Sequence, residues 1–215
     1  RAIALPGYQF SHWENRLVDN VDLTISMLSD VELTAVFVPI SPEDGALVIN
    51  EINYNSLNDY DSKDWVELFN GTLESVDLEG WSISDDSDDN LFVLPDLSLQ
   101  PGAYLIVSSD TLAFRSIHGG SSRIVGDLDF NFSNGGELIR LFNSDEILID
   151  SVRYDDEDPW PIEPDGEGPT LELIHPTLDN GLRSSWAVSD NLGTPGMQNS
   201  RFVNPSTITE HHRPA

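Results

Sequence analysis

Three short segments at residues 49–54, 65–70 and 76–81 constrain the fold of this chain more than any other feature. In each of them apolar side chains alternate with polar ones, which is the pattern of a half-buried β-strand. The loops between them are rich in Asn, Asp, Ser and Gly, the residues that accept turn geometry most readily. We therefore predict an antiparallel sheet whose strands follow one another along the chain.

Strand-like patterns continue over most of the chain. They lie near residues 46–54, 64–70, 75–84, 90–94, 103–109, 137–143, 146–154, 170–175 and 183–188. Many short strands with brief connections predict an all-β fold, a two-sheet sandwich with Greek-key connections. One helix is expected after Asp110, a good N-cap, because apolar residues within 112–117 fall near helical spacing and Gly119 follows them. Asn134-Gly135 is the strongest tight-turn signal.

Four further stretches carry distinctive sequence. They read PGAYLIV at 101–107, FSNGGEL at 132–138, IDSVRY at 149–154 and GTPG at 193–196. Together with the three segments between 49 and 81, and in the same order, they resemble the lamin tail domain, which many bacteria carry in large exported proteins. The resemblance covers roughly residues 46–199 and implies an immunoglobulin-like sandwich.

The first part of the chain has its own pattern. Residues 1–40 contain strand candidates at 8–13, 21–27 and 31–38, and the stretches PGYQFSHWE at 6–14, TISM at 24–27 and LTAVF at 33–37 resemble the closing half of an internalin-type B repeat. We therefore expect 1–40 to be the C-terminal part of such a repeat, a small N-terminal β segment. Residues 41–45 are expected to be a linker, and 200–215, which lack periodicity, a linker or disordered tail.

Charge and composition exclude several classes of protein. The chain has 38 acidic and 10 basic residues, and its net charge of −28 repels phosphate backbones, so we expect no nucleic-acid partner. Cysteine is absent, which excludes disulfides, thiolate metal sites and a cysteine nucleophile. No apolar run approaches the roughly 18 residues that span a bilayer. We therefore expect no membrane insertion. We also expect a monomer.

Two acidic loops are the candidates for metal binding. Each packs several carboxylates into six residues, the density of oxygen ligands that calcium requires. Neither loop is an EF-hand, because Asp64 and Asn90 stand where the EF-hand needs Gly. Solvated acidic surface is the alternative interpretation. The candidate calcium ligands are Asp59, Asp61 and Asp64 in the first loop and Asp85, Asp86, Asp88 and Asp89 in the second.

Two glutamates and one tryptophan complete the candidates. Glu51 and Glu67 lie inside strand-like segments, and a glycosidase needs two carboxyls about 5 to 10 Å apart across a cleft. The simpler interpretation is that they bind backbone at the ends of the sandwich or face solvent. Trp160, held between Pro159 and Pro161, could stack on a sugar ring or on a partner's apolar surface. Packing over the end of the sandwich is its alternative.

The resemblance implies a non-catalytic module for binding, adhesion or spacing within a larger exported bacterial protein, with an extracellular or cell-surface location. Its partner would be a protein or a carbohydrate. A calcium-dependent carbohydrate-binding module that uses the acidic loops and Trp160 is the second hypothesis. An acidic hydrolase built on Glu51 and Glu67 is the third.

Overall fold

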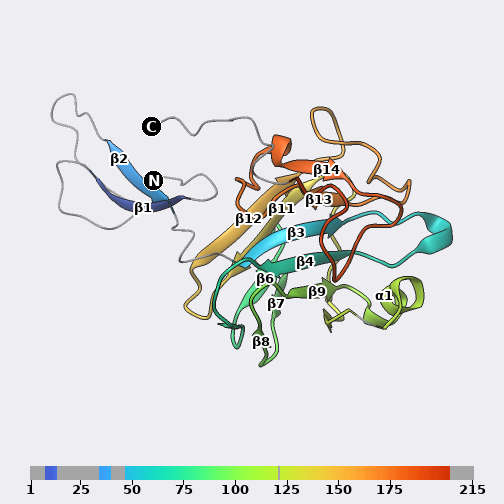
Figure 1. The fold of residues 1–215 in the computed structure, drawn as a ribbon, viewed down its shortest axis with the longest axis horizontal. Coiled ribbons are helices and arrows are strands. Elements are labelled where there is room, and N and C mark those ends of the chain that lie inside the picture. Colours follow the sequence, from blue (N-terminus) through green and yellow to red (C-terminus); the bar gives the residue numbers. More distant parts are fainter. Residues whose placement is uncertain (1–7, 14–33, 40–46, 121, 204–215) are drawn as a thin grey trace.

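The computed structural model describes residues 8–13, 34–39, 47–120 and 122–203. Within these ranges the fold is mostly β with one short helix, and the two larger sheets lie against each other as layers (Figure 1). In the described part of the chain, no helix has the length and apolar character needed to cross a membrane.

The larger layer is a six-stranded sheet in the order β10-β9-β4-β3-β13-β14. Its members are β3 (Leu47–Asn53), β4 (Trp65–Asn70), β9 (Tyr104–Ser108), β10 (Ile124–Gly126), β13 (Leu171–Leu173) and β14 (Trp186–Val188). Neighbouring strands are antiparallel, except that β10 runs parallel to β9. Strands far apart in the sequence, β3 and β13, are therefore adjacent in the middle of this sheet.

The second layer is a four-stranded sheet in the order β12-β11-β6-β7. It contains β6 (Ser82–Ser84), β7 (Leu91–Val93), β11 (Glu137–Phe142) and β12 (Leu148–Tyr154), all antiparallel to their neighbours. A short antiparallel ladder joins β5 (Val76–Asp77) to β8 (Ser98–Leu99). Two 3₁₀ turns, η2 (Asn58–Tyr60) and η3 (Arg183–Ser185), lie in connections.

One hydrophobic core fills the space between the layers. Inward-facing side chains of both sheets contribute to it, among them Ile52 and Val66 of the larger sheet and Ile139 and Val152 of the smaller one. Tyr54 stacks on Tyr154 with ring centroids 4.6 Å apart, although one residue follows β3 and the other ends β12. The predicted all-β sandwich is confirmed.

A second cluster lies on the outer face of the six-stranded sheet, beneath α1 (Thr111–His118), the green helix beside β9 in Figure 1. Phe114 of this helix packs on Trp65 and Ile106, and all three are fully buried. Asp110 caps the helix, because its carboxylate accepts hydrogen bonds from the backbone N–H of Leu112 and of the following residue. The predicted helix and its cap are confirmed.

Several strand predictions need correction. The single strand predicted at 75–84 is wrong, because the chain turns at Gly80, whose φ is +75°, and the two halves join different sheets as β5 and β6. The prediction also missed β8 and β10, each too short to show a periodic pattern. Residues 134–135 do form the predicted turn.

The N-terminal segment forms an antiparallel pair of strands, β1 (Tyr8–Trp13) and β2 (Ala35–Pro39). β1 confirms the strand predicted at 8–13, and β2 overlaps the one predicted at 31–38. The strand predicted at 21–27, the linker at 41–45 and most of the tail at 200–215 lie outside the described residues.

Candidate functional site

Three glutamates lie side by side on the outer face of the six-stranded sheet, and we call them the carboxyl row. Glu51 of β3 is the register partner of Glu67 on β4, and Glu172 of β13 is the register partner of Glu51. Side chains paired in this way stand about 5 Å apart at their Cβ atoms. All three glutamates have 0% of their surface exposed. Three acidic groups are thus collected in one dry place.

An irregularity in β3 places this row on the outer face. The register between β3 and β4 shifts between Ile49 and Glu51, so that Ile49 and Ile52 both enter the core. A strand without such a bulge would send residues 49 and 51 to the same face. The bulge therefore turns Glu51 outward, to the same side as Glu67.

The C-terminal loop, residues 189–203, covers the row, and we call it the strap. The backbone N–H of Thr194 donates to Glu51 Oε1 at 3.0 Å, and the backbone N–H of Gly196 donates to Glu67 Oε2 at 2.6 Å. The Thr194 hydroxyl donates to Glu172 Oε1 at 2.6 Å. The three carboxyls thereby hold one short stretch of strap.

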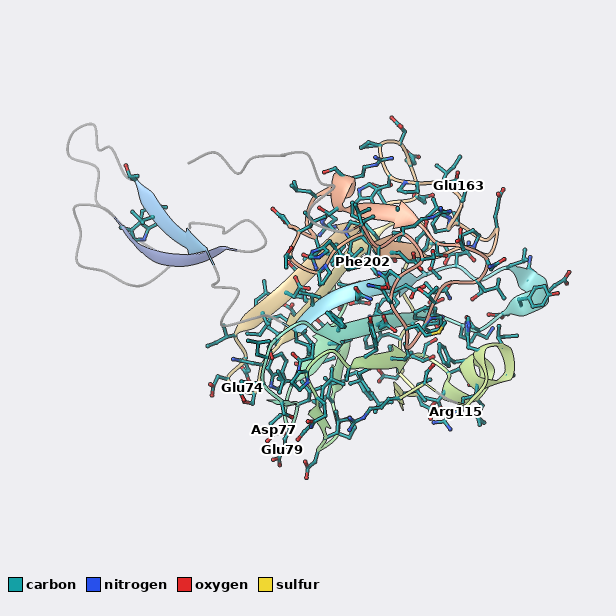
Figure 2. All side chains as sticks on the ribbon, in the orientation of Figure 1. Glu74, Asp77, Glu79, Arg115, Glu163 and Phe202 are labelled. Carbon is teal, nitrogen blue, oxygen red and sulfur yellow. The ribbon has the colours of Figure 1, made fainter. Side chains whose placement is uncertain are left out.

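The remaining strap contacts extend this anchoring. Glu172 Oε2 accepts hydrogen bonds from the Ser200 hydroxyl at 2.7 Å and from the Arg201 backbone N–H at 2.9 Å. Asn199 is buried and donates to the backbone oxygens of Asn50 and Leu173. At the end of the strap, Phe202, which is labelled in Figure 2, lies 5.0 Å from the ring of His175. The attachment of the strap is therefore mainly polar.

The two glycines of the GTPG stretch allow the strap to lie close to the carboxyl row. Gly193 has φ +91° and Gly196 has φ +81°, a backbone conformation that other residues adopt only at a cost. A side chain at Gly193 would overlap Glu51 Oε1 and lie 3.0 Å from Thr170, and one at Gly196 would lie 2.8 Å from Ser122 Oγ. Glycine at both positions lets the strap approach the row.

Burial changes the acid strength of the row. Desolvation, followed by the charge of Glu67, raises the pKa of Glu51 well above its ordinary range, against the opposing hydrogen bond from Thr170. Desolvation also raises the pKa of Glu67 to about 8, opposed by donors from Gly196 and Asn50. The row is therefore a place that can hold protons near neutral pH.

These positions decide between the interpretations of Glu51 and Glu67. Backbone donors from the strap confirm that both side chains bind backbone, although they do so on the outer face of the six-stranded sheet rather than at the ends of the sandwich. The expectation that they face solvent is wrong. A hydrolase needs carboxyls that meet substrate and water. With the strap in place, Glu51 and Glu67 meet neither.

The three aspartates of the first acidic loop have different surroundings. Asp61 pairs with Lys63 at 2.5 Å, and Asp59 lies exposed on η2. Asp64 is half-buried and accepts a hydrogen bond from the backbone N–H of Phe132 at 2.9 Å. Desolvation raises the pKa of Asp64 to about 7. Asp64 thus ties the start of β4 to the FSNGG stretch.

The second acidic loop is matched with arginines from the adjacent sheet. Arg140 pairs with Asp88 at 2.7 Å, and Arg153 pairs with Asp86 at 2.7 Å. Asp85 accepts hydrogen bonds within its own loop, and Asp89 is exposed. Across the described residues, no group of three or more His, Cys, Asp or Glu side chains is arranged to hold a metal ion. Calcium binding at either loop stays a prediction.

Trp160 is half-buried, packs against the main core, and lies 6.5 Å from the ring of Trp186. This packing agrees with the alternative interpretation, in which the Trp160 side chain packs on the sandwich. Its use as a ligand platform stays a prediction.

Two buried acids were not identified from the sequence. They are Glu172 of the row and Asp150 of β12. Asp150 of β12 accepts hydrogen bonds from Ile49 N and from Asn180 Nδ2, both at 2.7 Å, and so links the two layers. Burial raises its pKa to about 6. The one signal for the row was the GTPG stretch, whose glycines indicate a close backbone approach.

Comparison with known proteins agrees with the motifs. Residues 41–156, more than half of the chain, match the Lamin Tail Domain. Glu172 and the strap lie beyond the matched residues. Glu51 and Glu67, which the strap covers, lie inside them. No curated protein matches the chain. The chain belongs to the Lamin Tail Domain family.

Proposed function

We propose that this chain is a non-catalytic binding module of a larger exported protein, located at the cell surface or outside the cell, and that it binds a protein partner. The observation that supports this proposal is the outer face of the four-stranded sheet, which we call the open face. It consists of Leu91, Val93, Arg140, Phe142, Leu148 and Arg153.

The open face combines exposed apolar side chains with two arginines and with the buried Ser82 and Ser84 of β6. Val93 is paired with Ser82, Ser82 with Phe142, and Phe142 with Leu148, so one line of mostly apolar side chains crosses all four strands. Val93 is 55% exposed and Leu148 49%. The six-stranded sheet, in contrast, has its outer face covered by α1 and the strap. Contiguous exposed apolar patches mark interaction sites.

Electrostatics favours a protein partner at this face. Asp88 and Asp86 pair with the two arginines of the face, and the Arg140 guanidinium lies 5.6 Å from the centre of the Phe142 ring. The face therefore carries little net charge on a molecule of net charge −28, which lowers the desolvation cost of docking. Aliphatic side chains suit an apolar protein surface, whereas sugars stack on aromatic rings.

The test is surface crosslinking with charge-matched variants. The Leu91→Asp/Val93→Asp variant places two charges in the open face. The Leu73→Asp/Leu112→Asp variant adds the same charge at two other exposed leucines, 92% and 79% exposed. We expect the first variant to lose the crosslinked partner of the native chain and the second to keep it, while both retain the native circular dichroism spectrum.

Retention of the partner by the open-face variant would refute the proposal. Binding to a glycan array that is abolished by Trp160→Ala would also refute it, because the carbohydrate hypothesis would then hold.

A further inference from the structure

One oxygen atom of the carboxyl row has no hydrogen-bond donor. Glu51 Oε2 is buried without a partner, whereas Oε1 accepts hydrogen bonds from Thr170 Oγ1 at 2.5 Å and Thr194 N at 3.0 Å. A buried ionised oxygen without a donor is costly. A protonated carboxyl has an O–H that can itself donate, and Glu67 and Glu172 are the cross-strand neighbours of Glu51. A proton on Glu51 Oε2 removes the charge that makes the burial of this oxygen costly.

We propose that the carboxyl row holds a shared proton when the strap is closed, and that loss of this proton releases the strap, so that the row and strap form a pH-sensitive clasp. In the closed state the proton keeps one member of the row neutral. When base removes the proton, three adjacent negative charges remain in a dry site. Water must then reach the carboxylates to solvate them. Opening of the strap admits this water without breaking the pairing of the strands.

The charged groups around the row do not neutralise it. Arg201, the cation of the strap, directs its Nε to the Val188 carbonyl oxygen at 2.7 Å and its Nη2 to Asp190 at 2.8 Å. Tyr104 on β9 is the titratable neighbour of Glu67, and desolvation raises its pKa to about 12, which keeps it neutral. Within the row, Glu172 adds to the repulsion felt by Glu51 and Glu67. The proton is therefore the available counter-charge.

The strap is suited to reversible release. Its hold on the row consists of hydrogen bonds rather than a buried apolar face, and Met197, its large apolar side chain beside Gly196, is 60% exposed. Ionised carboxylates accept these hydrogen bonds more strongly than neutral ones. Release on proton loss therefore requires that desolvation and mutual repulsion in the row exceed this gain, and burial does raise the pKa values of Glu51 and Glu67 against the donors of the strap. The described residues offer no arrangement able to hold a metal ion at the row. The structure thus fits a proton better than a cation.

The test uses Glu51→Gln, which keeps Oε1 as an acceptor and places an N–H donor where the protonated Oε2 would be. Glu74→Gln removes the same charge at an exposed site and serves as the control; Glu74 is labelled in Figure 2. Limited proteolysis between pH 6 and 9, with cleavage sites mapped by mass spectrometry, measures opening of the strap. NMR shifts of the Thr194 and Gly196 amides follow the same equilibrium.

We expect strap cleavage in the native chain and in Glu74→Gln to accelerate by roughly tenfold per pH unit as pH rises toward the titration midpoint of the closed row, which is the linkage slope for one proton, and to level off above it. Glu51→Gln should stay closed at pH 9. Equal cleavage of the native chain and Glu51→Gln at every pH would overturn the proposal. Closure of the native strap at pH 9 by calcium but not by magnesium would also overturn it, since the occupant would then be a cation.

A direct titration keeps the proposal testable if Glu51→Gln does not fold. Carboxyl ¹³C shifts of the native chain should show at least one member of the row protonated at pH 7. Titration of all three carboxyls below pH 5 would refute the shared proton.

Discussion

Replacing Gly193 by alanine should reveal how much the docked strap contributes to stability. The residue has φ +91°, and a methyl group there would overlap Glu51 Oε1 and lie 3.0 Å from the Thr170 side chain. The backbone alone costs about 1 kcal/mol. Displacing the strap also breaks the hydrogen bond from Thr194 N to a buried acceptor, a further loss of about 1 to 3 kcal/mol. We expect Gly193→Ala to lower the free energy of unfolding by about 2 to 4 kcal/mol.

Gly102→Ala provides the matched control. Gly102 has φ +70°, and nothing lies within 4 Å of the position that its Cβ would take. This variant carries the backbone cost of about 1 kcal/mol without the collision. Urea unfolding at pH 6, with equal m-values required of both variants, measures the difference. If the two variants agree within about 0.5 kcal/mol, the docking of the strap does not stabilise the fold and the reasoning fails.

Three further predictions concern pH, the helix and calcium. Burial raises the pKa of Glu67 from 4.5 to about 8 and that of Asp150 from 3.8 to about 6, so the native state binds protons that the unfolded chain releases. The melting temperature should therefore fall as pH rises from 5 to 8 at constant ionic strength; a flat or rising profile would contradict the raised pKa values. Asp110→Ala should lower the free energy of unfolding by about 1 kcal/mol through loss of the cap, while Asp96→Ala at an exposed loop position should change it by less than about 0.5 kcal/mol in the same urea titration. If an acidic loop binds calcium, calcium should raise the melting temperature more than magnesium does at equal ionic strength. Equal increments would show that the loops are solvated acidic surface, in which arginines already neutralise Asp86 and its neighbour Asp88.

Local features of the fold could be predicted because their causes are local. Asp110 and Gly119 mark the two ends of α1 through hydrogen bonds to residues within a few positions, and both ends are where the sequence places them. The longer strands show period two over five residues or more, which is enough to identify them. The short strands β8 and β10 have no such pattern and exist only because a neighbouring strand pairs with them.

The carboxyl row could not be predicted because its causes are non-local. Glu51 faces the strap only because β3 bulges beside it, and its partner Thr194 lies 143 positions away. Glu172, between two leucines, has the pattern of an exposed strand position. The acidic loop at 85–90 was interpreted as a candidate metal site because the partner of Asp86, Arg153, lies 67 positions further along the chain.

The position of the strap has a consequence for synthesis of the chain. The carboxyls of Glu51 and Glu67 leave the ribosome long before Gly196, and at about 5 to 20 residues per second the interval is roughly 6 to 30 seconds. For most of this time β13 has not yet been synthesised, so the backbone edge of β3 in the nascent sheet stands open beside two ionisable side chains. Charge on an edge is one means by which proteins discourage wrong strand pairing. The acids that later hold the strap can thus protect the unfinished domain from premature association.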